Sequence, residues 1–163
     1  MKPATFDYTR PGTRREACDL LHEFGDDARL IAGGQSLMAV LNMRFAQPGL
    51  LIDIAGIQDL HYIEDRGDYL AVGAGITQAE LLEHPGLAEK VPLLAQAMPW
   101  IGHAQTRNRG TVCGSIAHAD PSAELPLCLT ALGGEVVLEA RKGKTRKLPA
   151  HEFFQGILTT AKR

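Results

Sequence analysis

Two glycine-containing segments carry residue types that could bind a phosphate group. The first, Ala32-Gly33-Gly34-Gln35-Ser36, stands between a short apolar run and a segment with helical spacing. Glycines let backbone N–H groups approach an anion, and the N-terminus of the following helix adds partial positive charge. Such a site can hold a diphosphate without a lysine, and Ser36 would add a hydroxyl donor. The alternative is a plain turn in which Ser36 caps the helix.

The second segment, residues 106–115, is richer in small, hydroxyl and arginine residues. Its glycine and hydroxyl residues permit close backbone contact with an anion, and two arginines, Arg107 and Arg109, could raise the local potential. A solvated loop with two surface arginines is the alternative. Because two such segments occur in one small domain, we expect both to give N–H groups to the same diphosphate.

Other nucleotide-binding patterns are missing or incomplete. The sequence has no Gly-x-x-x-x-Gly-Lys-Ser/Thr, which excludes a P-loop. Gly73 and Gly75 begin like a dinucleotide fingerprint, but Gln78 stands where the third glycine is required. A Rossmann-type NAD site is therefore not expected.

Composition restricts the classes of protein to which the chain can belong. With 163 residues, 45% of them hydrophobic, the chain can bury the core of one domain or two small subdomains. The net charge of −2 comes with scattered Lys and Arg residues, so nucleic acid is not an expected partner. Cys18, Cys113 and Cys128 are odd in number and far apart, which argues against disulfides and a metal site. No apolar leader or run of 18 apolar residues occurs, so we expect a cytoplasmic protein without a membrane span.

The elements that position the first segment form a predicted β-α-β unit. A capping-box pattern at Thr13–Glu16 opens a helix that should stop at Gly25. Apolar runs at residues 28–32 and 50–54 predict two strands, and the spacing over residues 36–43 predicts a helix between them. A short crossover of this kind makes the two strands parallel.

From about residue 56 the pattern changes to hairpins and short helices. Expected hairpins pair residues 61–64 with 69–72 and 135–140 with 145–148, and expected helices cover 77–84, 92–98 and 120–132. Asp120 should be the N-cap of the last helix, with Pro121 in its first turn. The fold class is therefore α+β, with a small N-terminal β-α-β subdomain in residues 1–55 and a larger, mainly antiparallel subdomain in 56–163. No closing element is expected after Phe154, which suggests a truncated chain.

Two longer stretches, residues 32–37 and 111–126, carry a family resemblance. Their sequences and separation resemble the flavoprotein (medium) subunit of molybdenum hydroxylases, of the carbon monoxide dehydrogenase medium-subunit type, related to the FAD domain of xanthine dehydrogenase. The resemblance extends over nearly the whole chain and implies a fold of the p-cresol methylhydroxylase (PCMH) and vanillyl-alcohol oxidase type. FAD would lie between the N-terminal and central subdomains, and the C-terminal domain of the family would be absent here.

The resemblance also implies the residues around the cofactor. They are Ala32, Gly33, Gly34, Gln35, Ser36, Leu37, Ile101, Thr111, Val112, Gly114, Ser115, Ala117, Asp120 and Glu124. Many relatives have a second glycine in place of Cys113, and a thiol is compatible with this position if its side chain points inward. Glu124 matches an acidic position near the flavin ribitol, although a first-turn carboxylate favoured by the helix dipole is the alternative. Trp100 lies in a segment that matches one near the isoalloxazine. No catalytic residue and no metal ligand is expected.

The implied function is electron relay. In the family, electrons pass from a molybdenum centre through [2Fe-2S] clusters to FAD, and then to NAD or another acceptor. The chain lacks cysteine clusters for iron–sulfur binding, so these centres would belong to a [2Fe-2S] small subunit and a molybdopterin-containing large subunit. The alternative is a truncated module that keeps the fold and the docking surface but does not retain FAD.

Overall fold

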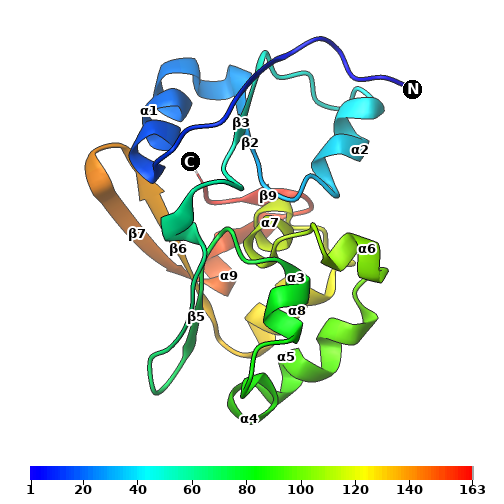
Figure 1. Ribbon diagram of the computed structural model, residues 1–163, viewed down its shortest axis with the longest axis vertical. Helices are drawn as coiled ribbons and strands as arrows, with labels where there is room; N and C mark the ends of the chain where they lie inside the picture. The colour runs from blue at the N-terminus through cyan, green and yellow to red at the C-terminus, as the bar shows by residue number, and fades with distance from the viewer. Residues whose placement is uncertain (163) are drawn as a thin grey trace.

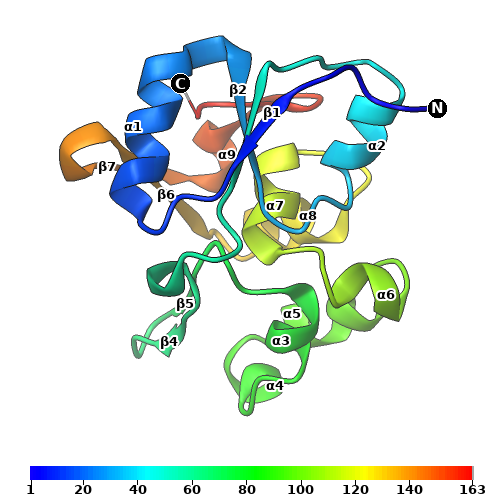
Figure 2. The same cartoon turned by 45° about the horizontal axis from the view of Figure 1, so that its top comes forward.

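The computed structural model describes residues 1–162, and its N-terminal part is built on a three-stranded parallel sheet (Figures 1 and 2). The strand order is β1-β3-β2, with both neighbouring pairs parallel. The strands are β1 (Asp7–Thr9), β2 (Ala28–Ile31) and β3 (Leu50–Asp53). The predicted β-α-β unit is confirmed by β2, β3 and the intervening α2 (Leu37–Asn42). β1 was not predicted, because three residues are too few to show an alternating pattern.

The first helix, α1 (Arg14–Phe24), begins and ends where the sequence indicated. The Thr13 hydroxyl accepts a hydrogen bond from Glu16 N, while the Glu16 carboxylate accepts one from Gly12 N at 2.7 Å. Gly25 closes the helix at φ 51°, a conformation that favours glycine. A single 3-10 turn, Gly25–Asp27, then leads into β2.

The rest of the chain consists of antiparallel pairs and short helices. Both predicted hairpins are confirmed, β4 (Ile63–Asp65) with β5 (Leu70–Val72) and β6 (Glu135–Ala140) with β7 (Lys144–Pro149). The α-helices are α3 (Gln78–Leu82), α4 (Leu87–Lys90), α5 (Pro92–Ala97), α6 (Ala104–Arg107), α7 (Val112–His118), α8 (Glu124–Ala131) and α9 (Ala150–Phe153). The 3-10 turns are η2 (Gln58–Leu60), η3 (Met98–Trp100) and η4 (Arg141–Gly143).

Two expectations about this part are wrong. The helix predicted to start at Asp120 begins at Glu124, with Ala123 as its N-cap residue. Asp120 instead accepts a hydrogen bond from Ser122 N, and this local turn competes with helix formation. The end of the chain also carries a small hairpin, in which β8 (Phe154–Gly156) pairs with β9 (Thr159–Thr160).

Buried apolar side chains form two clusters. The first joins Ala17 of α1 to Ala28, Leu50 and Ile52 of the parallel sheet. The second extends from Ile76 to Phe153 and includes Val112 and Ile116 of α7 and Leu125 of α8. The boundary near residue 55 stays a prediction.

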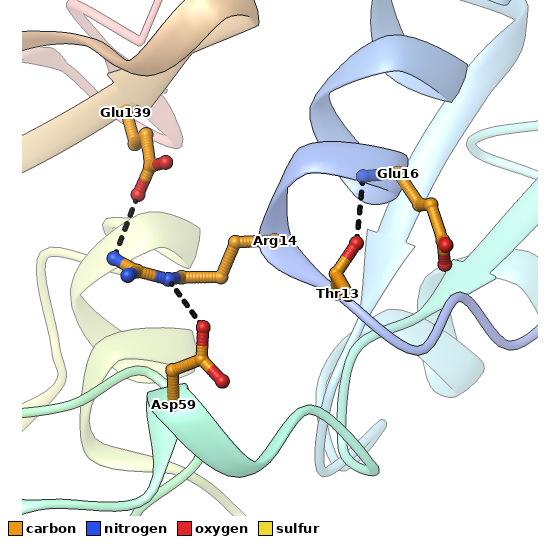
Figure 3. Close-up of polar contacts among 5 residues, drawn as sticks. All are labelled: Thr13, Arg14, Glu16, Asp59 and Glu139. Atoms are coloured by element: carbon orange, nitrogen blue, oxygen red, sulfur yellow. Dashed lines mark hydrogen bonds and ion pairs between the residues drawn. The ribbon is translucent and has the colours of Figure 1, made fainter.

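Arg14 links the start of α1 to two distant segments (Figure 3). Its guanidinium donates to Asp59 in η2 at 3.2 Å and to Glu139 in β6 at 3.0 Å. A further ion pair joins Asp19 of α1 to Arg141 of η4 at 2.9 Å. These groups are partly exposed, so each pair contributes at most about 1 kcal/mol. Together they join the start of α1 to η2 and to the β6–β7 hairpin.

Candidate functional site

The first glycine segment is a turn with free N–H groups between β2 and α2. Within residues 1–162, the backbone N–H groups of residues 33–37 donate to no acceptor of the chain. Gly34 has φ +71°, which favours glycine, and Ser36 makes no capping hydrogen bond to α2. Ser36 therefore stands at the N-cap position of α2 without the capping hydrogen bond that the plain-turn alternative expected. Because α2 has only six residues, the hydrogen-bond donors that this turn offers are its individual N–H groups.

The two predicted segments touch at Gly33. A Cβ atom at Gly33 would lie 1.9 Å from Arg109 O and 2.7 Å from Gly110 Cα, so only glycine permits this approach. Figures 1 and 2 both show the loop after β2 running beside α7. The sequence indicated both segments but gave no signal that their backbones are in contact.

The second segment is largely a helix start rather than a loop. Thr111 is the N-cap of α7, and its hydroxyl accepts from Gly114 N at 3.0 Å. Val112 N donates to Ile76 O, and Ser115 N donates to Thr111 O. Of the N–H groups in residues 111–115, only those of Thr111 and Cys113 lack an acceptor within the described chain. The whole stretch was expected to offer N–H groups to a diphosphate. In the structure, only the N–H groups of Thr111 and Cys113 are available as such donors.

The two arginines of the second segment have different roles. Arg107 donates to the carbonyl oxygens of Ile101 at 2.9 Å and Gly102 at 3.2 Å, so it satisfies the end of η3. Arg109 is exposed and lines the cavity beside the first segment. Arg109 therefore has the position to raise the local positive potential, as was predicted for both arginines. Arg107 instead binds backbone carbonyl groups.

A cavity of about 370 Å³ adjoins the first segment. Its lining residues come from the sheet, the turn, α2 and the second segment, and they are Tyr8, Ile31, Ala32, Gly33, Gly34, Gln35, Met38, Asp53 and Arg109. The volume is within the range of small-molecule sites. The sequence analysis missed Tyr8 and Asp53 because neither stands in a glycine motif. A signal existed for Asp53, since it is a polar residue at the end of an apolar strand.

The other predicted cofactor residues do not line this cavity. Ile101 and Val112 are buried in the second core cluster. Ser36 is exposed and Leu37 half-buried at the start of α2. Thr111, the N-cap of α7, is also buried. The remaining members lie in α7, in α8 or between them and are exposed or half-buried, and they are Gly114, Ser115, Ala117, Asp120 and Glu124. Trp100, named beside Ile101, is 80% exposed.

Cys113 points into the protein, the orientation under which a thiol is compatible with a position where many relatives have glycine. Its thiol donates to Val72 O at 3.6 Å. Burial raises the pKa of the Cys113 thiol to about 11. The side chain therefore does not cover the outer side of the α7 N-terminus. With this raised pKa, the thiol is neutral at physiological pH.

Cys113 should consequently react very slowly with alkylating reagents. With a pKa of about 11, roughly one thiol in a thousand is ionised at pH 8, and only the thiolate is nucleophilic. We expect iodoacetamide to modify Cys113 at least about 100-fold more slowly than in the urea-unfolded chain. Peptide mass spectrometry over time measures this rate. Equal rates in the folded and unfolded chain would contradict the inward orientation.

Comparison with known proteins identifies the family. The family model described as the FAD binding domain in molybdopterin dehydrogenase matches residues 4–163. The chain belongs to this family. It is 43% identical, over 94% of its length, to 6-hydroxypseudooxynicotine dehydrogenase complex subunit alpha of Paenarthrobacter nicotinovorans, of which it covers 52%. It is 41% identical to the carbon monoxide dehydrogenase medium chain of Hydrogenophaga pseudoflava, over 98% of this chain and 55% of that one.

Solved structures agree with this FAD-binding family. The structure of carbon monoxide dehydrogenase from Hydrogenophaga pseudoflava superposes with a TM-score of 0.94 at 41% identity, covering 99% of this chain and 56% of the other. Quinoline 2-oxidoreductase from Pseudomonas putida 86 also gives 0.94, at 35% identity and the same coverages. The expected resemblance and fold are thereby confirmed. The chain spans about half the length of the curated relatives it matches.

The site fits the diphosphate of FAD, the cofactor of this family. Free N–H groups of residues 33–37 are hydrogen-bond donors at a turn beside the cavity. The contact between Gly33 and Arg109 brings a cation to the same turn. Backbone donors with an arginine nearby are an arrangement that binds phosphate without lysine. Among the described residues, no helix has the length and apolar character needed to cross a membrane.

Proposed function

We propose that this chain is the FAD-binding part of a medium subunit in a molybdenum hydroxylase-type dehydrogenase. The row of free N–H groups in residues 33–37, packed against Arg109, is the observation that carries the proposal. Membership of the FAD-binding family and the dehydrogenase names of the relatives support it. When bound, FAD supplies the redox chemistry, and the protein supplies binding and orientation.

The diphosphate would be held by the N–H groups of residues 33–37, with Thr111 and Cys113 as donors from the second segment. Ser36 would add its exposed hydroxyl, and Arg109 would balance the negative charge. Ala117, Asp120 and Glu124 would face the riboflavin half, because they follow Thr111 along α7 and into α8. Glu124, the first residue of α8, would accept a hydrogen bond from a ribitol hydroxyl.

The remaining redox centres would belong to partner chains. Relatives are named as subunits or medium chains of dehydrogenases, which supports assembly into a complex. We propose a [2Fe-2S] small subunit and a molybdopterin-containing large subunit as partners, with NAD or another molecule as final acceptor. A cytoplasmic location is part of the same proposal. The alternative, a docking module without FAD, has no observation in its favour.

Reconstitution tests the proposal. The purified chain should bind FAD in a saturable, one-to-one manner in calorimetric titration. Mixed with the proposed iron–sulfur and molybdopterin subunits, it should allow the substrate of the complex to bleach the absorbance of the bound flavin. A chain that binds no FAD, or bound flavin that stays oxidised in the assembled complex, would contradict the proposal.

A further inference from the structure

A short antiparallel contact joins the start of α3 to the second glycine segment. Thr77 pairs with Thr111 in an isolated antiparallel bridge, and beside this pair Gln78 N donates to Gly110 O at 2.8 Å. Gln78 therefore stands opposite Gly110, and residues opposite each other in an antiparallel pair place their side chains on the same face. The side chain of Gln78 consequently covers a residue that has no side chain of its own.

The Gln78 carboxamide lies against Gly110 with its nitrogen end. A Cβ atom at Gly110 would be 3.4 Å from both Cδ and Nε2 of Gln78, and Oε1 is no nearer than these two atoms. Gln78 is only 5% exposed, and within residues 1–162 its Oε1 is buried without a hydrogen-bond partner. The dipole of the amide therefore has its positive end at Gly110 and its negative end unpartnered in the interior.

Packing alone does not explain a carboxamide at this position. A buried acceptor without a hydrogen bond destabilises the folded state, and an apolar side chain of the same length would avoid that cost. The side chain of Gln78 thus lowers stability where methionine or leucine would raise it. Residues that lower stability in this way are found where function requires them.

The positive end of the amide lies where the two glycine segments meet. Gly110 Cα lies 2.7 Å from the position of a Cβ atom at Gly33, and Gly110 directly precedes Thr111. The N–H group of Thr111 has no acceptor within the described chain. Partial charges act more strongly at a buried site than in water, because the surroundings screen them less. An anion bound by this N–H group would therefore be stabilised by the Gln78 amide.

We infer that Gln78 is a positioning residue for the diphosphate, and that its carboxamide dipole raises the positive potential at the Gly110–Thr111 peptide. The inference rests on the proposed function and adds to it a residue from outside both glycine segments. Gln78 does not line the cavity, so it acts through the peptide rather than by touching the ligand. Oriented amide groups stabilise anions in the same way at other phosphate sites.

Gln78→Met removes the dipole and keeps the length of the side chain. In calorimetric titrations with FAD, ADP and inorganic pyrophosphate, each dissociation constant should rise about 2- to 5-fold, which is the size of dipole effects on a nearby ion. The temperature of thermal unfolding should stay equal or rise, because the unpartnered acceptor is gone. A residue that only stabilised the fold would lower the unfolding temperature instead.

Gln78→Glu keeps the shape of the side chain and reverses the sign of its potential. At pH 8 the dissociation constants for the same three ligands should rise at least about 10-fold, because a full negative charge lies behind the peptide that binds the anion. Gln96→Met and Gln96→Glu are the matched controls, since Gln96 is an exposed residue of α5 that does not line the cavity. Both control variants should bind all three ligands as the unsubstituted chain does.

The inference is overturned by unchanged affinity in either Gln78 variant while that variant remains folded. It is equally overturned if Gln78→Met loses affinity together with a lower unfolding temperature, because Gln78 would then be a purely structural residue. Failure of the unsubstituted chain to bind FAD would instead contradict the proposed function.

Discussion

Replacing Gly33 by alanine should raise the dissociation constant for FAD by about 5- to 150-fold. The new methyl group would lie 1.9 Å from Arg109 O, so the backbone of residues 109–110 must move. Overpacking of this kind costs about 1–3 kcal/mol and would separate the two segments that hold the diphosphate. Calorimetric titration of the variant with FAD measures the change.

Gly12→Ala is the control for the Gly33 substitution. A Cβ atom at Gly12 meets nothing closer than Glu16 Oε2 at 3.7 Å, so the added methyl group fits. This variant should bind FAD as the unsubstituted chain does. If Gly33→Ala also kept its affinity while remaining folded, the turn after β2 would not be the diphosphate site.

Replacing Phe153 by alanine should lower the free energy of unfolding by about 3–5 kcal/mol. Phe153 is 1% exposed in the second core cluster, and its ring meets that of Phe154 edge to face at 5.2 Å. The same cluster holds Val112, so the start of α7 depends on this packing. Urea unfolding followed by circular dichroism gives the change in free energy.

Phe45→Ala provides the matched comparison for Phe153. Phe45 is 79% exposed, and its loss should change stability by less than about 0.5 kcal/mol. A similar effect of both substitutions would mean that Phe153 is not part of the core. FAD affinity in Phe153→Ala should fall only as far as the folded population falls.

The sequence was sufficient where a local pattern decides the structure. Thr77 and Glu80 form the predicted capping box at α3, with the Glu80 carboxylate accepting from Thr77 N at 2.7 Å. The glycine turn at Gly33 and Gly34 was likewise evident, since glycine pairs between a strand and a helix mark a turn. These features depend on neighbours within about four residues.

Features that depend on distant contacts could not be predicted in the same way. β1 exists because Tyr8 pairs with Leu51 in β3, and the pattern of three residues gives no sign of it. The contact of Gly33 with Arg109 joins residues from different parts of the chain. The Asp120 prediction was wrong because the side chain bonds to Ser122 N, a turn that is as compatible with Asp-Pro as a helix N-cap.

The central claim is that backbone N–H groups of residues 33–37 bind the diphosphate of FAD. A two-dimensional amide NMR spectrum of the isotope-labelled chain, recorded during titration with ADP and then FAD, tests it directly. The largest shifts in both titrations should fall on Gly33, Gly34, Gln35, Ser36 and Leu37, with Thr111 and Cys113 as the next group. Shifts that leave residues 33–37 unchanged while FAD saturates the chain would contradict the account.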